Sequence, residues 1–188
     1  ALAKKMGLPV PVIEVIAQHH EHHDGGGYPA GLKGDQIRPL TRVVALVNQY
    51  DNLCNPGNPA HALTPHDALA LIFARQRDAF DSAVLAAFIR MMGVYPPGSV
   101  LQLNDDRYAI VVSVNSERPL KPCILIHEPE IPIEEALLLD LECHSGIGIQ
   151  RAVKPIQLPR AVFDYLSPRK RICYFFERSA TTSRSEPT

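Results

Sequence analysis

The stretch that decides how this chain folds and what it can bind reads His19-His20-Glu21-His22-His23-Asp24-Gly25-Gly26-Gly27-Tyr28-Pro29-Ala30-Gly31-Leu32-Lys33-Gly34. Four of the eight histidines of the chain fall within its first five residues. Neutral imidazole is the commonest side-chain ligand for first-row transition metals. The three consecutive glycines cannot continue a helix, so the stretch predicts a helix end that is rich in metal ligands.

Upstream of this stretch, residues 9–23 carry apolar side chains at helical spacing. On such a helix His19 and His20 point about 100° apart, so they suit two neighbouring ions, or one ion and a bound phosphate, unless the helix ends there. His19 and His23 are four residues apart and share a face, which also allows a single-ion site. Histidines that only interact with the dipole at a helix C-terminus are a third interpretation of the same residues.

The stretch resembles the signature of the HD-GYP family. That signature runs His-His-Glu, two variable residues, Asp-Gly, a small residue, Gly-Tyr-Pro, a variable residue and Gly-Leu. The resemblance covers residues 1 to about 95 and is specific, because the match is long and ungapped. The matching residues are His19-His20-Glu21, Asp24-Gly25, Gly26, Gly27-Tyr28-Pro29, Gly31-Leu32, Ile37, Pro39-Leu40 and Arg42.

The resemblance implies metal-assisted hydrolysis of the phosphodiester of cyclic di-GMP. A divalent metal cluster, of iron or manganese, would bind the phosphate and supply the attacking hydroxide. The roles that follow are metal ligation by His19, His20 and Asn48, catalysis by Asp24 and Tyr28, and substrate binding by Gly27, Tyr28 and Pro29.

The resemblance leaves more than one role open for Lys33, Arg42 and Glu21. Lys33 and Arg42 are the nearest basic side chains in sequence and are candidate substrate contacts, although each also suits a solvated charge. Glu21 is expected to be solvated at the helix end, to bind metal directly or to hydrogen-bond to a ligating histidine. The glycines at 25–27 fit a backbone that needs unusual φ values.

The chain departs from the family pattern in three ways. The His-Asp pair that names the superfamily is absent, so the chain is expected to be a piece of a longer protein and to be inactive by itself. The family's ligating carboxylate falls on Asn48, whose neutral amide is a weaker ligand, and Asp51 is a candidate substitute on the same face. A family Arg-Pro-Tyr-Arg segment is replaced by Gly57-Asn58-Pro59-Ala60.

Two functions of different classes follow from these residues. The first is a cyclic di-GMP phosphodiesterase in the complete protein, favoured by the intact His19-His20 pair. The second is a degenerate, non-catalytic module that binds cyclic di-GMP or a protein partner, favoured by Asn48 and the missing arginines. A phosphohydrolase acting on another nucleotide is a third, since no residue here selects guanine by itself.

The order of elements predicts an α+β fold, with a helical half-domain followed by a small β-rich part. The expected domains are residues 1–94, a β-rich extension over 95–178 and a disordered tail over 179–188. A barrel or a meander would suit the β-rich part, in which His127, Glu128 and His144 lack a visible catalytic partner. The expected helices span 9–23, 40–53, 65–76, 81–92 and 159–166, and Thr64 and Asp81 are the expected N-caps of the third and fourth. The buried side of the helix over 40–53 is expected to carry Val43, Val44, Leu46, Val47, Tyr50 and Leu53. The expected strands span 99–103, 108–114, 122–127, 137–142, 149–153 and 171–176, and alternation in 108–114 indicates one buried face.

Composition and charge limit the classes of partner that this chain can bind. Nineteen basic and 20 acidic residues nearly balance, which argues against a surface for nucleic acid polymers. No apolar run is long enough to span a bilayer, and the four scattered cysteines suit reduced thiols, so a cytoplasmic protein is expected. Cyclic di-GMP is the expected ligand, with a diguanylate cyclase as candidate protein partner and a homodimer as candidate assembly.

Overall fold

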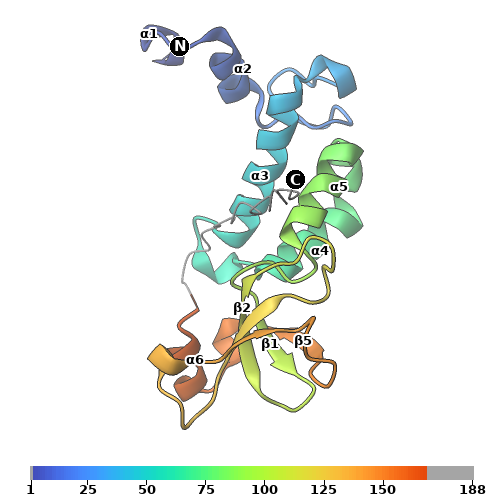
Figure 1. Ribbon diagram of the computed structural model, residues 1–188. Coiled ribbons are helices and arrows are strands. Elements are labelled where there is room, and N and C mark those ends of the chain that lie inside the picture. The colour runs from blue at the N-terminus through green and yellow to red at the C-terminus, as the bar shows by residue number, and fades with distance from the viewer. Residues whose placement is uncertain (1, 169–188) are drawn as a thin grey trace, which may run out of the picture.

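The computed structural model describes residues 2–168 and shows a helical part followed by a β-sheet (Figure 1). This confirms the predicted α+β class. The α-helices are α1 (Leu2–Lys5), α2 (Val10–Gln18), α3 (Pro39–Cys54), α4 (Pro65–Arg75), α5 (Ser82–Met92) and α6 (Arg160–Leu166). The strands are β1 (Val100–Leu103), β2 (Tyr108–Ser113), β3 (Cys123–Ile126), β4 (Leu138–Asp140) and β5 (Ile149–Val153). Short 3-10 turns, η1 (Gly34–Gln36), η2 (Pro59–His61), η3 (Arg77–Ala79), η4 (Ile133–Glu135) and η5 (Pro155–Gln157), connect them.

Side-chain caps set the starts of α4 and α5, as predicted. The Thr64 hydroxyl accepts a hydrogen bond from the Asp67 amide at 3.1 Å. The Asp81 carboxylate accepts from the amides of Ala83 and Val84 at 2.9 and 3.1 Å. Each cap satisfies amides that have no partner inside the helix, which stabilises the helix by about 1 kcal/mol.

The core of the helical part lies between α3, α4 and α5. Leu46, Tyr50 and Cys54 form the buried row of α3, and the Tyr50 ring meets Phe88 of α5 edge-on at 5.2 Å. The predicted buried side of α3 was wrong at Val43 and Val47, which are each 42% exposed. These two valines lie one helical turn apart, off the row that faces α4 and α5.

Helix α2 is shorter than the predicted helix over residues 9–23. It ends at Gln18, because the chain turns there to bury Glu21 and to pair the His23 amide with the carbonyl of Ala79 at 2.8 Å. None of the residues of α2 is buried. Among its apolar side chains, Val10 is 65% exposed and Ile16 is 49% exposed.

The sheet is antiparallel in the order β4-β3-β2-β1-β5, which is the meander alternative with β5 added beside β1. One face buries Leu101, Leu103, Ala109, Val111, Ile124, Ile126 and Leu141. The other face packs Val100 and Val153 against Val162 and Leu166 of α6. The predicted strand over 171–176 and the predicted tail over 179–188 lie outside the described residues.

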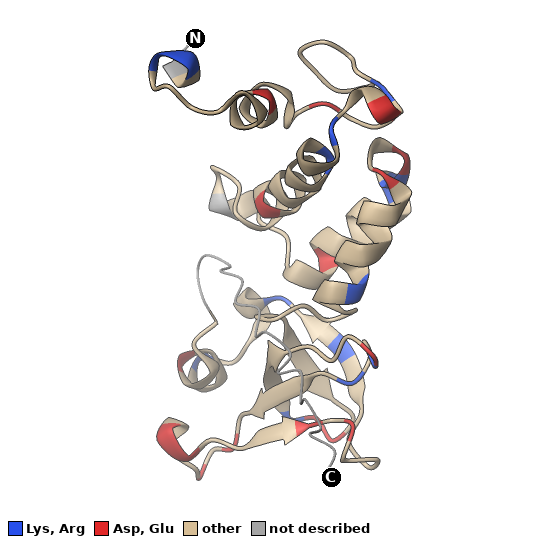
Figure 2. Cartoon of the chain, turned by 45° about the horizontal axis from the view of Figure 1, so that its top comes forward, with Lys and Arg blue, Asp and Glu red and all other residues tan. Residues whose placement is uncertain are grey.

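Charged residues of both signs are distributed along the helical part and the sheet (Figure 2). Within residues 2–168, none of the helices has the length and apolar character needed to cross a membrane.

Candidate functional site

The two adjacent histidines lie just after the end of α2. Their ring centroids are 4.0 Å apart and the ring planes are tilted by 39°. The His19 Nδ1 lies 2.9 Å from the carbonyl oxygen of Ile16. Since a carbonyl only accepts, His19 Nδ1 must carry the proton, which leaves Nε2 with a lone pair available to a metal. The helix end therefore brings the two imidazoles side by side, which a continuing helix would not do.

The surroundings of His20 favour its neutral form. Burial lowers the pKa of His20, and the nearby charges of His19 and then His22 lower it further. Desolvation and like charge both disfavour the protonated imidazole. A neutral imidazole is the form that binds a metal.

The Tyr28 ring stacks on the His20 ring, with centroids 4.7 Å apart and planes inclined by 21°. The Tyr28 amide also donates to the carbonyl of His20 at 3.1 Å. Tyr28 is 60% exposed, so much of its surface stays open to a ligand. The structure thus brings three predicted site residues, His19, His20 and Tyr28, into one patch, and Pro29 follows Tyr28 on the exposed loop.

Glycine is required in the loop for two different reasons. Gly25 has a φ of +84°, which is the left-handed region expected from the sequence. Gly27 instead approaches the histidine segment closely, because a Cβ there would lie 2.2 Å from the His22 nitrogen. The prediction of unusual φ was therefore wrong for Gly26 and Gly27, neither of which has a positive φ. Asp24 shapes the loop, since its carboxylate accepts from the Gly26 amide at 2.8 Å.

Glu21 holds the other side of the same loop. Its side chain is 1% exposed, and its two carboxylate oxygens accept from the amides of Ala30 at 2.6 Å and Leu32 at 2.9 Å. The expectation of a solvated Glu21 was wrong. The sequence offered one signal, a carboxylate beside a glycine-rich loop whose amides need acceptors.

The two basic candidates differ in how strongly the fold engages them. Lys33 is exposed, and its aliphatic stem covers Gly25. Arg42 donates to the carbonyl of Ile37 and to the carboxylates of Asp81 and Asp35, each at 2.8 Å. The hydrogen bond to Asp35, followed by that to Asp81, raises the pKa of Arg42. These contacts indicate that Arg42 links the loop, α3 and the start of α5, and that its guanidinium is already engaged by these partners.

Asn48 lies on α3 and is half-buried. Asp51, the candidate substitute, accepts from the Asn55 side chain at 2.7 Å near the end of the same helix. Across residues 2–168, no three side chains of the His, Cys, Asp and Glu types gather closely enough to hold a metal ion. The described residues therefore present an imidazole pair and not a full coordination sphere.

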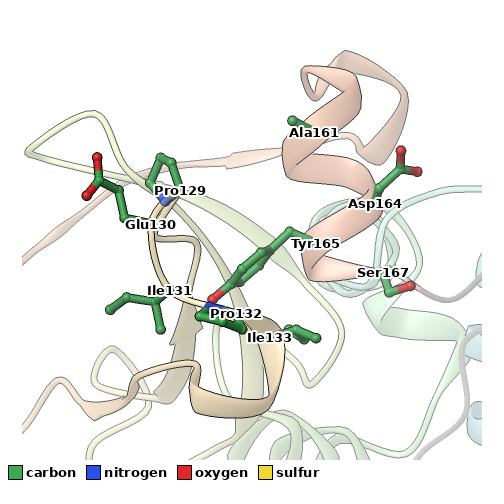
Figure 3. A pocket seen from close by; sticks show the side chains of 9 residues that line it. All are labelled: Pro129, Glu130, Ile131, Pro132, Ile133, Ala161, Asp164, Tyr165 and Ser167. Atoms are coloured by element: carbon green, nitrogen blue, oxygen red, sulfur yellow. The ribbon is translucent and has the colours of Figure 1, made fainter.

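One hollow lies in the β-rich part. It measures about 550 Å³ between the segment 129–133 and α6 (Figure 3). Its walls carry two carboxylates, Glu130 and Asp164, and the ring of Tyr165. Asp164 is already paired with Arg160 at 2.7 Å. The residues that line the hollow include no histidine, so it lacks the imidazoles that distinguish the loop patch.

Residues 1–84 match the family model described as HD domain. A cyclic di-GMP phosphodiesterase of Pseudomonas aeruginosa is 28% identical over 130 residues, which are 68% of this chain and 31% of that protein. A cyclic di-GMP phosphodiesterase response regulator of Xanthomonas campestris is 36% identical over 76 residues, which are 40% of this chain and 20% of that protein. A 3'3'-cGAMP-specific phosphodiesterase of Vibrio cholerae is 35% identical over 79 residues, which are 42% of this chain and 17% of that protein. The chain thus spans less than a third of the length of these relatives.

Proposed function

We propose that the helical part of this chain belongs to the HD-GYP branch of the HD domain family and forms the C-terminal portion of a metal-dependent phosphohydrolase domain. In the complete protein this domain hydrolyses the phosphodiester of cyclic di-GMP. The observation that carries the proposal is the pair of adjacent imidazoles beside an exposed tyrosine at a glycine-rich loop.

HD domains depend on divalent metal, and the donors of this chain suit part of such a centre. His19 has its Nδ1 bonded to a carbonyl, which is the arrangement that orients a ligating imidazole. Imidazole nitrogen suits iron, and an oxygen donor such as the amide of Asn48, the third candidate ligand in the chain, suits manganese. When bound, the metal polarises the phosphodiester and generates hydroxide from water. The remaining ligands would come from residues outside this chain.

The loop residues bind and orient the substrate. Tyr28 offers an exposed ring on which a nucleobase can stack, and Gly27 and Pro29 set the backbone on either side of it. Lys33 lies in the open and can meet a phosphate charge, whereas Arg42 keeps the loop in place through its carboxylate partners. Asp24 acts on the loop through its bond to the Gly26 amide, and we retain it as a catalytic candidate.

The exposed apolar side chains of α2 and α3 support a larger domain. Val10, Ile16, Val43 and Val47 lie on two helices in contact with each other, and each is at least 42% exposed. Burying an aliphatic side chain of this size stabilises a fold by about 1.5–3 kcal/mol. Further helices of the complete protein would be stabilised by packing on these side chains, and they would bring the missing ligands to the histidines.

The experiment is hydrolysis of cyclic di-GMP by the complete protein, purified without oxygen and supplied with iron or manganese. We expect turnover in the wild type. His19→Ala and His20→Ala should each lower kcat/KM by more than about 100-fold, since loss of a ligand's hydrogen-bond partner alone costs about 10–100-fold. His144→Ala, which removes an exposed histidine of the β-rich part, is the matched control and should leave kcat/KM unchanged.

A second candidate is a non-catalytic receptor, and Asn48 in place of a carboxylate is the observation that favours it. Metal-loaded protein that binds cyclic di-GMP without turnover would select this function. The same assay with 3'3'-cGAMP tests the third function, because one relative is named for that substrate. A cytoplasmic location, a diguanylate cyclase partner and a homodimer stay predictions.

A further inference from the structure

We infer that Glu21 is a positioning residue, which acts through the loop 28–32 to hold the Tyr28 ring against His20. The inference rests on the proposed function for its consequence in catalysis. It rests on the contacts of this chain alone for its geometry.

Glu21 is the one ionisable side chain among the buried polar residues of the described chain. A buried carboxylate is costly unless both of its oxygens are hydrogen-bonded. Here Oε1 accepts from the Ala30 amide at 2.6 Å and Oε2 accepts from the Leu32 amide at 2.9 Å. Such charge-assisted bonds are about twice as strong as neutral ones, so the loop is tied firmly at two alternate residues.

The opposite end of the loop is tied to the histidines. Gly27 lies so close to the preceding segment that a Cβ there would sit 2.5 Å from the Glu21 Cα and 2.5 Å from the His20 oxygen. Directly after it, the Tyr28 amide donates to His20. Tyr28 therefore stands between a close contact on one side and the carboxylate clamp on the other.

This arrangement explains why an exposed tyrosine keeps a defined position. A ring that is 60% exposed gains little from burial, so its stacking on His20 depends on the backbone that carries it. The two hydrogen bonds to the Glu21 carboxylate fix that backbone, and they thereby fix the position of the Tyr28 ring beside His20. Glu21 itself is buried, so its effect on a substrate would pass through the loop.

The first arm of the test observes the geometry without catalysis. In the metal-free chain, NMR should show contacts between the ring protons of Tyr28 and His20. Glu21→Gln replaces one acceptor oxygen with a donor and should abolish these contacts, while the signals of α4, α5 and the sheet stay in place. Glu14→Gln is the matched control, because the half-buried Glu14 pairs with Arg38 and not with the loop 28–32, so the contacts should stay intact.

Glu21→Asp serves where Glu21→Gln fails to fold. It keeps the charge but is one methylene shorter, so it cannot reach both amides and should also weaken the ring contacts. Persistence of the Tyr28–His20 contacts in a folded Glu21 variant would overturn the inference.

The second arm measures kcat/KM for cyclic di-GMP in the complete protein. Glu21→Gln should lower it by about 10–100-fold with metal content unchanged, as for other groups that orient a site. In a Tyr28→Ala background the same substitution should cost less than about threefold, because residues that act as a unit are not additive. Equal costs in both backgrounds would reject action through Tyr28. Absence of turnover in the wild type would reject the proposed function and leave the NMR arm to decide the role of Glu21.

Discussion

Residue 48 is the point at which this chain departs most clearly from the HD-GYP pattern. An amide oxygen carries no net charge, so it binds a divalent ion more weakly than a carboxylate does. Asn48 is half-buried on α3, where a side chain can reach a neighbouring segment without full exposure to water. Metal ligation by Asn48 stays a prediction.

Asn48→Asp should therefore raise metal occupancy of the complete protein. We expect an increase in metal affinity of about tenfold, the lower end of what single groups around a metal contribute. Metal content after dialysis against a graded chelator measures it. Asn52→Asp places the same charge at an exposed position of the same helix and is the control. Equal occupancy in the two variants would remove Asn48 from the metal site.

Single residues also show what the sequence could and could not predict of the site. The motif predicted the grouping of His19, His20 and Tyr28, because local spacing and a helix end decide it. Arg42 differed, since Asp81 is 39 positions away in sequence and no local pattern reveals that pairing. The roles of all these residues in catalysis stay predictions.

At the scale of elements, the start of α5 depends on its N-cap residue, Asp81. The Asp81 carboxylate accepts hydrogen bonds from the first amides of the helix and also forms an ion pair with Arg42 of α3. The hydrogen bond from the Val84 amide, followed by those from Arg42 and Ala83, lowers the pKa of Asp81 against an opposing effect of burial. The folded state thus holds Asp81 as a carboxylate at lower pH than the unfolded chain does.

This pKa shift predicts how stability depends on pH. A folded pKa below the unfolded one contributes stability above the unfolded pKa, and the contribution is lost as pH falls through the folded value. Asp81→Ala should cost about 1–2 kcal/mol near pH 7, and the difference from wild type should shrink below about pH 4. Urea unfolding at a series of pH values measures it. Asp78→Ala removes an exposed carboxylate that caps no helix and should change stability by less than about 0.5 kcal/mol. A cost for Asp81→Ala that is constant down to pH 2 would contradict the shift.

The elements themselves were largely predictable. Thr64 and Asp81 marked the starts of two helices, and alternation in 108–114 marked β2, because caps and periodicity are local properties. The end of α2 was not predictable, since burial of Glu21 and pairing of His23 with Ala79 depend on tertiary contacts. Val43 and Val47 were misassigned for a related reason, because periodicity identifies an apolar face but not whether anything covers it.

At the scale of the whole molecule, side chains and backbone join the helical part to the sheet. The rings of His66 in α4 and Tyr95 stack at 5.0 Å, and His66 Nδ1 lies 2.8 Å from the carbonyl of Val94. The Val94 amide in turn meets the carbonyl of Pro119. The sheet is therefore anchored at the end of the helical part away from α2 (Figure 1), and the histidine patch lies at the opposite end.

The incomplete histidine patch decides what the isolated chain can bind and hydrolyse. The histidine patch lacks a third strong ligand among the described residues, and the helix beside it has no buried residue. The 188-residue chain with added manganese should therefore bind metal weakly and leave cyclic di-GMP intact, whereas the proposed function predicts turnover by the complete protein. The isolated chain should also bind a hydrophobic dye more strongly than the complete protein does. Its exposed apolar side chains would be covered in the complete protein, namely Val10, Ile16, Val43 and Val47. Hydrolysis by the isolated chain would mean that its own imidazoles suffice, and equal dye binding would mean that nothing covers α2 in the complete protein.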